Sequence, residues 1–204
     1  MANIQAPYGL SPVGTVAGAD YNQAGRLYAV ANDASNTYAI GDVVKVGAGS
    51  DANGVPYVTK LTNGAAGGDV PLGIIVGIRV ADAGVSLQGV DLKLSQNYLP
   101  VSSGAHYVYV VDDPNVIFTL QADSTALATS NMHNNAALSV TANQTTLSMS
   151  APQSSTVATS FGTGSTLPIQ ILGLAQTPNN SVGAYATLLA KWNTHQYFGS
   201  KSGA

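Results

Sequence analysis

The chain has 204 residues, its formal net charge is −3, and only 8% of its residues are charged. It has no basic run that would neutralise phosphates, so we expect no nucleic-acid partner. It also has no apolar stretch near the roughly 20 residues that span a bilayer, no signal-peptide pattern at its start, and no Cys for disulfides or thiolate metal sites.

The composition favours β-structure. All ten acidic residues are Asp and Glu is absent, whereas Glu and Lys are the usual residues of exposed helix faces. The 22 Gly and 9 Pro, with many Ser, Thr and Asn, are typical of short strands joined by tight turns. So few charges are typical of surfaces covered by partner subunits, although a neutral β-protein rich in Ser and Thr would have the same composition.

Residues 1–25 contain closely spaced Pro and Gly and few consecutive β formers, which predicts an extended N-terminal arm. The apolar side chains Ile4, Tyr8, Leu10 and Val13 favour an arm that docks on another surface, against the alternative of a disordered tail. The remaining residues, 26–204, are expected to form a single β-rich domain.

Four strands are predicted in the first part of this domain, because β formers there alternate with clusters of turn residues. The predicted strands cover residues 26–31, 40–46, 55–61 and 72–80. The second and third flank residues 47–54, which are rich in Gly, Ser, Asp and Asn, and these two strands are predicted to pair as a hairpin.

The strand at residues 72–80 has a clear period of two. Gly73 and Gly77 fall between its apolar residues and indicate either close approach of another backbone or a bulge. The alternation predicts that the even-numbered residues share one buried face. These residues are Leu72, Ile74, Val76, Ile78 and Val80.

A second hairpin is predicted at residues 106–121. Its strands, 106–111 and 116–121, flank the sequence Asp-Asp-Pro-Asn, in which Asp followed by Pro has the pattern of a type I turn. With these four residues as the loop, three cross-strand pairs share one face. The pairs are Val111 with Val116, Tyr109 with Phe118, and Tyr107 with Leu120.

Residues 123–166 are rich in Ser, Thr, Ala, Asn and Gln and are interpreted as a loop-rich insertion. Short strands are predicted within it at 137–141, 145–149 and 156–160, with a short helix at 125–131, and the last strands are predicted at 167–175 and 185–194. Many short strands without helix-period segments indicate an all-β fold, either a β-sandwich, a jelly roll or a barrel-like fold.

The sequence contains no motif for catalysis, a cofactor or a metal, and we expect a protein that is not an enzyme. The adjacent carboxylates Asp112 and Asp113 are explained by the turn. His106, His133 and His195 are far apart and lack the spacing of a zinc site. Residues 51–54, Asp-Ala-Asn-Gly, are similar to part of a calcium loop, but its closing Glu does not occur in this chain.

Nine short segments follow one another along the chain in an order that can be compared with known protein families. The series begins with APYGLSPVG at 6–14, IGDVV at 40–44, DANGVP at 51–56, LGIIVG at 72–77 and YVVDDPN at 109–115. It continues with LPI at 167–169, ILGL at 171–174, PNN at 178–180 and AKWNTHQ at 190–196. In this order the segments resemble the capsid cement or decoration proteins of tailed bacteriophages, and residues 123–166 match least.

This resemblance implies a β-rich structural virion protein, assembled in the bacterial host cytoplasm and bound to the outside of a phage capsid. Its expected partners are the major capsid protein, whose capsomers it would bridge, and further copies of itself in a homodimer or homotrimer. The alternative function is a β-rich tail, baseplate or fibre component that binds host glycan.

Apolar and aromatic side chains near the two ends of the chain are the predicted partner contacts. The alternative is that these side chains complete the core of the protein itself. The six residues are Ile4, Tyr8, Leu10, Trp192, Tyr197 and Phe198.

Overall fold

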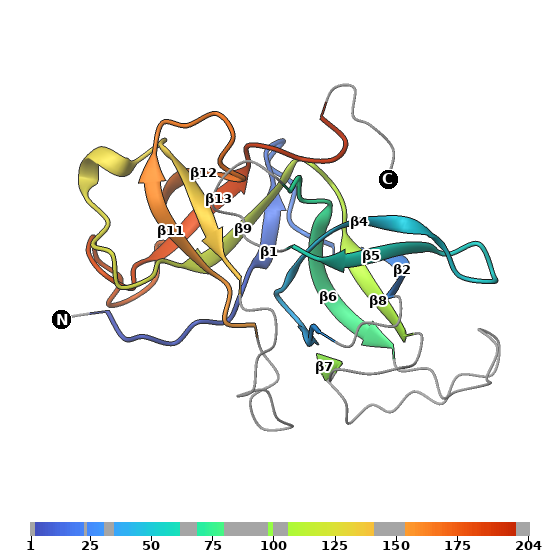
Figure 1. Cartoon of the computed structure of the whole chain (residues 1–204). Helices are drawn as coiled ribbons and strands as arrows, with labels where there is room; N and C mark the ends of the chain where they lie inside the picture. Colours follow the sequence, from blue (N-terminus) through green and yellow to red (C-terminus); the bar gives the residue numbers. More distant parts are fainter. Residues whose placement is uncertain are drawn as a thin grey trace.

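The computed structural model describes residues 3–22, 24–30, 35–61, 69–79, 98–99, 106–140 and 154–198. Their regular structure consists of strands and one short 3-10 helix, η1 (Thr129–Asn131), which confirms the predicted all-β, barrel-like class (Figure 1). The strands are β1 (Ser11–Thr15), β2 (Arg26–Val30), β3 (Tyr38–Ala39), β4 (Val43–Ser50), β5 (Pro56–Lys60), β6 (Gly73–Arg79), β7 (Tyr98–Leu99), β8 (His106–Val111), β9 (Val116–Gln121), β10 (Asn135–Ser139), β11 (Val157–Gly162), β12 (Ile169–Leu174) and β13 (Thr187–Trp192).

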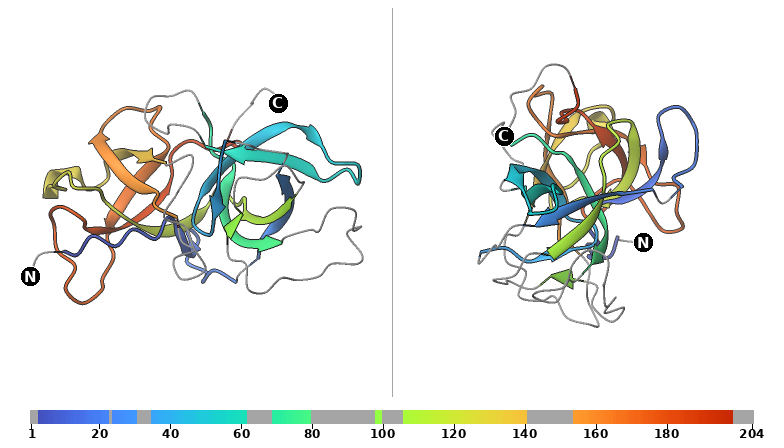
Figure 2. Two further views of the ribbon diagram at one scale, coloured as in Figure 1. Left: turned by 60° about the horizontal axis from the view of Figure 1, so that its bottom comes forward. Right: turned by 90° about the vertical axis from the view of Figure 1, so that its right-hand side faces the viewer.

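Most strands belong to two curved units that lie side by side (Figures 1 and 2). One is a closed barrel with the strand order β2-β5-β4-β6-β8, in which only β2 and β5 run parallel. The other is a six-stranded sheet with the order β1-β9-β13-β12-β10-β11. This sheet curls until Ala158 in β11 forms an isolated bridge with Ala122, just beyond the end of β9. Strands β3 and β7 pair separately.

Two clusters of buried apolar side chains stabilise this arrangement. The barrel cluster fills the barrel interior and includes Val58 and Val108. The shared cluster fills the curled sheet, where the rings of Phe118 and Trp192 lie 4.8 Å apart, and it also contains Ile74 from the barrel. Because the shared cluster draws side chains from both units, separating the units would expose it to water.

Strands β8 and β9 begin and end where the sequence predicts, but the predicted hairpin is wrong. β8 pairs with β2 and β6 in the barrel, whereas β9 pairs with β1 and β13 in the six-stranded sheet. The turn between them does form, with the Asn115 amide donating to the Asp113 carboxylate at 2.8 Å, but it carries the chain from one unit to the other. Both edges of β8 are already paired within the barrel, so β9 finds its neighbours elsewhere.

The predicted single buried face of strand 72–80 is also wrong. A bulge between Ile75 and Gly77 shifts the register of β6 against β8 and interrupts the alternation, so the strand is covered on two sides. Ile74 and Val76 pack in the shared cluster, while Leu72 and Ile78 pack in the barrel cluster, and Val80 lies outside the described residues.

The glycines of this strand have the roles that the sequence indicates. Gly77 lies at the bulge. Gly73 lies so close to β8 that a Cβ atom there would overlap the carbonyl oxygen of Val111. Close backbone approach and a bulge, the two alternatives for these glycines, therefore both occur in β6.

The first predicted hairpin is confirmed as β4 and β5, which pair antiparallel. In residues 123–166, the structure contains β10, β11 and η1, and the two strands belong to the six-stranded sheet. The helix is shorter than predicted, and the predicted strand at 145–149 lies outside the described residues.

The extended arm predicted for residues 1–25 is not confirmed. Residues 11–15 form β1 at the edge of the six-stranded sheet, and residues 3–10 run along the chain's own surface (Figure 1). The Ala6 amide donates to the Gln121 side chain and the Leu10 amide donates to the Gly41 carbonyl, each at 2.9 Å. Burial of the Leu10 side chain in the shared cluster fixes the end of this segment.

Candidate partner-binding groove

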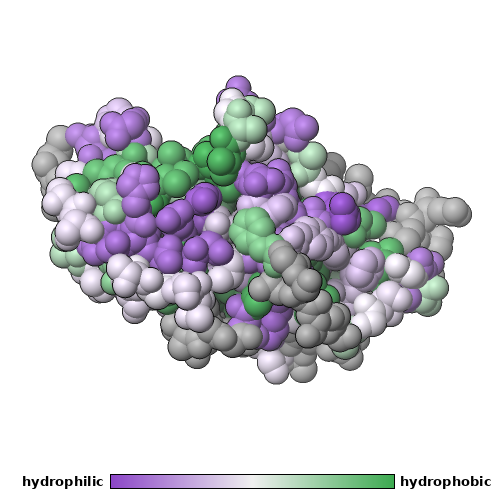
Figure 3. Space-filling view, turned by 90° about the horizontal axis from the view of Figure 1, so that it is seen from above, coloured by the Kyte–Doolittle hydropathy of each residue, from purple (hydrophilic) through white to green (hydrophobic). Residues whose placement is uncertain are grey.

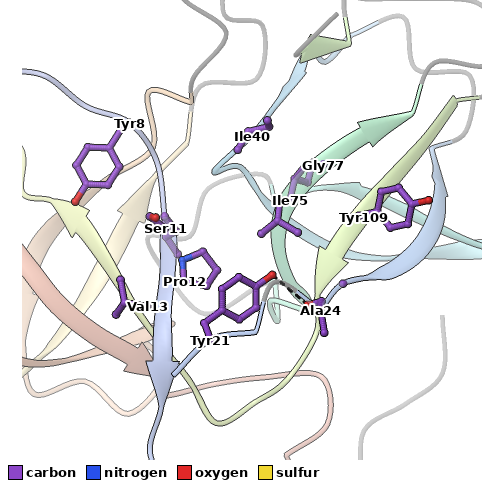
Figure 4. A pocket seen from close by; sticks show the side chains of 13 residues that line it. Tyr8, Ser11, Pro12, Val13, Tyr21, Ala24, Ile40, Ile75, Gly77 and Tyr109 are labelled. Carbon is purple, nitrogen blue, oxygen red and sulfur yellow. Dashed lines mark hydrogen bonds between the residues drawn. The ribbon is translucent and has the colours of Figure 1, made fainter. Parts of the chain in front are cut away.

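A groove of about 860 Å³ lies between the two units. Ser11, Pro12 and Val13 of β1 line one side of it, and Gly77 of β6 and Tyr109 of β8 line the other (Figure 4). The groove therefore lies where the edge strand of the six-stranded sheet meets the outer face of the barrel.

Local backbone features place the apolar side chains at the rim of the groove. The register of β1 against β9 shifts between Pro12 and Gly14, so Val13 is the extra residue of a bulge and is 42% exposed. Tyr109 lies between two buried valines of β8 and points out of the barrel, with 38% of its surface exposed. Gly77 leaves room for the Tyr109 ring, because a Cβ at Gly77 would lie 3.3 Å from a ring carbon.

No charged side chain is among the residues described as lining the groove. Its lining residues include the polar side chains of Tyr8, Ser11 and Tyr21, of which the Tyr8 hydroxyl points away from the other lining residues (Figure 4). Burial raises the pKa of both tyrosines, in Tyr8 against an opposing effect of its side-chain hydrogen bonds, so both stay neutral at physiological pH. The Tyr21 hydroxyl donates to the Ala24 carbonyl at 3.1 Å. The groove thus offers apolar surface with a few neutral hydrogen-bonding groups.

The six residues predicted as partner contacts do not form one surface. Leu10, with 2% of its surface exposed, and Trp192 are buried in the shared cluster, so in this conformation they complete the chain's own core. Tyr8 lines the groove. Ile4 is 81% exposed, and Tyr197 and Phe198 are partly exposed in the C-terminal segment. A partner-contact role for these four remains a prediction.

The C-terminal segment is fastened to the barrel around the Asp112 carboxylate. The hydroxyls of Tyr28 and Tyr197 donate to Asp112 Oδ2 at 2.7 and 3.3 Å, and Arg26 Nη1 lies 3.2 Å from the same oxygen. Burial and these contacts raise the pKa of Tyr28, so its hydroxyl remains a donor. This cluster satisfies one carboxylate with fixed donors, and it explains Asp112 as a structural anchor.

His195 packs beside this anchor and is fully buried. Its Nδ1 atom accepts a hydrogen bond from the Tyr197 amide at 3.1 Å. Burial lowers the pKa of His195 to about 4, although the Leu72 carbonyl and the charges of Asp112 and Asp113 act in the opposite direction. The ring is therefore a neutral packing element at physiological pH.

The Asp-Ala-Asn-Gly loop is held by hydrogen bonds from the protein to the Asp51 carboxylate. Asp51 accepts hydrogen bonds from the Asn53 and Val55 amides at 2.9 and 2.8 Å, and from the Tyr107 hydroxyl at 2.5 Å. Its carboxylate oxygens are thus occupied by donors of the protein itself. Within the described ranges no group of three or more His, Cys, Asp or Glu side chains is arranged to hold a metal ion.

The face seen from above carries a band of apolar residues over the half formed by the six-stranded sheet, bordered by polar residues (Figure 3). Among the residues that the structure describes, no helix has the length and apolar character needed to cross a bilayer.

Comparison of the chain with family models, curated proteins and solved structures finds no match.

The sequence interpretation missed the groove, because its two sides come from strands that are distant in sequence. One signal was available in β8, where Tyr109 lies between Val108 and Val110. A large side chain between two inward-facing valines must point out of the barrel, and Gly77 opposite it provides the space.

Proposed function

We propose that this chain is a structural virion protein, a cement or decoration protein that binds the outer surface of a phage capsid and bridges neighbouring capsomers of the major capsid protein. The observation that carries this proposal is the uncharged groove with Val13 and Tyr109 exposed at its rim. The ordered series of motifs along the chain supports the same function.

An apolar segment of the capsid surface is the ligand that such a groove fits. Binding removes the exposed parts of Val13, Ile40 and Tyr109 from water, and no charge has to lose its hydration shell. A protein that binds only the assembled shell stabilises it by mass action. Because the interaction involves few charges, its affinity should change little with ionic strength.

Binding to purified shells tests this proposal. Val13→Asp and Tyr109→Asp each place a charge at the rim of the groove, and we expect either change to reduce the amount of protein that sediments with expanded capsids. Val182→Asp is the matched control, since Val182 is 39% exposed and does not line the groove. Equal occupancy for all three variants and the unchanged protein would contradict the proposed role of the groove.

A glycan-binding component of the tail, baseplate or fibre is the second candidate. It is favoured by the tyrosines that line the groove, because aromatic rings and hydroxyls together suit sugar recognition. The two candidates differ in copy number, since a cement protein covers the whole shell and a tail component is present in far fewer copies. Quantitative mass spectrometry of purified virions, scaled to the major capsid protein, separates them.

A further inference from the structure

The end of the β4–β5 hairpin holds a pair of opposite charges that is sealed from solvent. Lys60 Nζ lies 2.8 Å from Asp42 Oδ2, and neither side chain has exposed surface. Asp42 immediately precedes β4, and Lys60 is the last residue of β5. The chain has only seven Lys and Arg residues, and here one of them is removed completely from water, which costs hydration energy for both charges.

We infer that Lys60 and Asp42 condense to an intramolecular isopeptide bond, an amide between the lysine Nζ and the aspartate carboxyl carbon. Because the two groups are already in contact, the entropic cost of bringing the reacting atoms together is small. Burial of both side chains also keeps the pair away from bulk water, which would otherwise compete for the hydrogen bonds around the carboxyl group. The inference concerns the maturation of the chain and is independent of the proposed function.

The hydrogen bonds of Asp42 assign different roles to its two oxygens. Oδ2 accepts a hydrogen bond from the Ala39 amide at 2.9 Å, so this backbone donor stabilises negative charge on Oδ2 while the amine adds to the carboxyl carbon. Oδ1 accepts a short hydrogen bond from the Ser154 hydroxyl, and Thr156 Oγ1 lies 3.4 Å away from it. Oδ1 is therefore the oxygen that leaves, and Ser154 is the group that relays a proton to it.

The step balances without an oxidant or any other reactant. One proton passes from the Lys60 ammonium to the Asp42 carboxylate, which gives the amine and the acid. The amine nitrogen then bonds to Cγ, the bond from Cγ to Oδ1 breaks, and a second proton from nitrogen joins Oδ1–H to form water. The product is a neutral amide, which is less costly to bury than two charges.

The amide that results has both of its hydrogen-bonding groups already provided for. Its oxygen is Oδ2, which keeps the Ala39 amide as donor. Its N–H keeps the Thr37 carbonyl, which now accepts from Lys60 Nζ at 2.9 Å. The surroundings of the pair thus fit the condensed product as well as the ion pair.

A second ion pair provides a matched control within the same chain. Lys45 Nζ and Asp69 Oδ1 are also 2.8 Å apart, but their side chains are 30% and 21% exposed. At this site both charges keep contact with water, so we expect Lys45 to remain a free amine.

Mass spectrometry of the full chain, purified folded and then denatured, tests the inference. We expect a mass lower than that of the sequence by one water. Trypsin should cleave after Lys45 and fail to cleave after Lys60, which yields residues 27–45 joined to residues 46–79. Lys60→Met and Asp42→Ala should restore the full mass, and Ser154→Ala should lower the fraction of linked chain.

Two results would overturn the inference. One is the full sequence mass in the folded, unchanged protein after prolonged incubation. The other is a loss of water that persists in Lys60→Met, because the dehydration would then lie at another residue, such as an Asp that forms a cyclic imide. Since the first measurement needs no variant, failure of a variant to fold does not affect the decision.

Discussion

Acidification should destabilise this protein through His195. The ring is buried among the rings of Trp192, Tyr197 and Phe198, with centroid distances of 5.9, 5.4 and 5.7 Å. In the folded chain burial lowers its pKa from 6.5 to about 4. The unfolded chain therefore binds a proton at a pH where the folded chain does not, and protonation favours unfolding.

The size of the effect follows from these two pKa values. At about 1.4 kcal/mol per pH unit, the full difference is worth about 3 kcal/mol. Its contribution is complete above pH 6.5 and decreases as the pH falls towards 4. Between about pH 7.5 and about pH 4.5, the unfolding free energy should fall by about 2.5 kcal/mol because of this one ring.

Urea unfolding at a series of pH values measures the effect. Trp192, the only Trp of the chain, is buried beside His195, so its fluorescence reports on unfolding of this region. His195→Gln keeps a neutral polar side chain and removes the titration. We expect a smaller decrease in stability on acidification for this variant, with the difference reaching about 2.5 kcal/mol. Parallel pH profiles for the two proteins would refute the reasoning.

Two further predictions concern packing. Gly73→Ala should lower the unfolding free energy by about 1–3 kcal/mol, since the added Cβ overlaps the Val111 carbonyl, whereas Gly162→Ala, with open space around it, should change it by less than about 0.5 kcal/mol. Denaturant titrations that give equal values would contradict the close approach of β6 and β8. Leu10→Ala should cost about 2–5 kcal/mol because Leu10 is buried, and Ile4→Ala should cost less than about 0.5 kcal/mol. A thermal shift as large for Ile4→Ala would show that residue 4 is buried.

Local sequence signals predicted the strands better than their pairing. The bounds of β8 and β9 follow from β formers on either side of a turn, which are properties of adjacent residues. Their partners do not, because Ser11 of β1 pairs with Thr119 of β9, a contact between residues far apart in the chain. A turn with hairpin chemistry can also carry a chain between two sheets, and the sequence of the turn does not distinguish these cases.

The candidate groove was less predictable than the strands for the same reason. Its lining combines an edge strand, a bulge and the outer face of a barrel, and only Tyr8 and Leu10 of its residues were among the predicted contacts. The low charge of the chain did indicate that an uncharged surface would be found. The buried pair of Lys60 and Asp42 had no signal in the sequence, because a lysine in a strand is ordinarily solvated.

The barrel strands lie in the sequence between β1 and the other strands of the six-stranded sheet, and this order determines when each unit can fold during synthesis. The five barrel strands are complete once residue 111 has been synthesised, so the barrel can close early. In contrast, β1 has no sheet neighbour until β9 is made, and β9 lacks its second neighbour until β13, near the C-terminus, is made. Until translation reaches residue 192, the outward apolar residues of the barrel, Val43, Ile74 and Val111, lack their cover. Unfinished or prematurely terminated chains thus expose an aggregation-prone apolar surface that is buried in the complete protein.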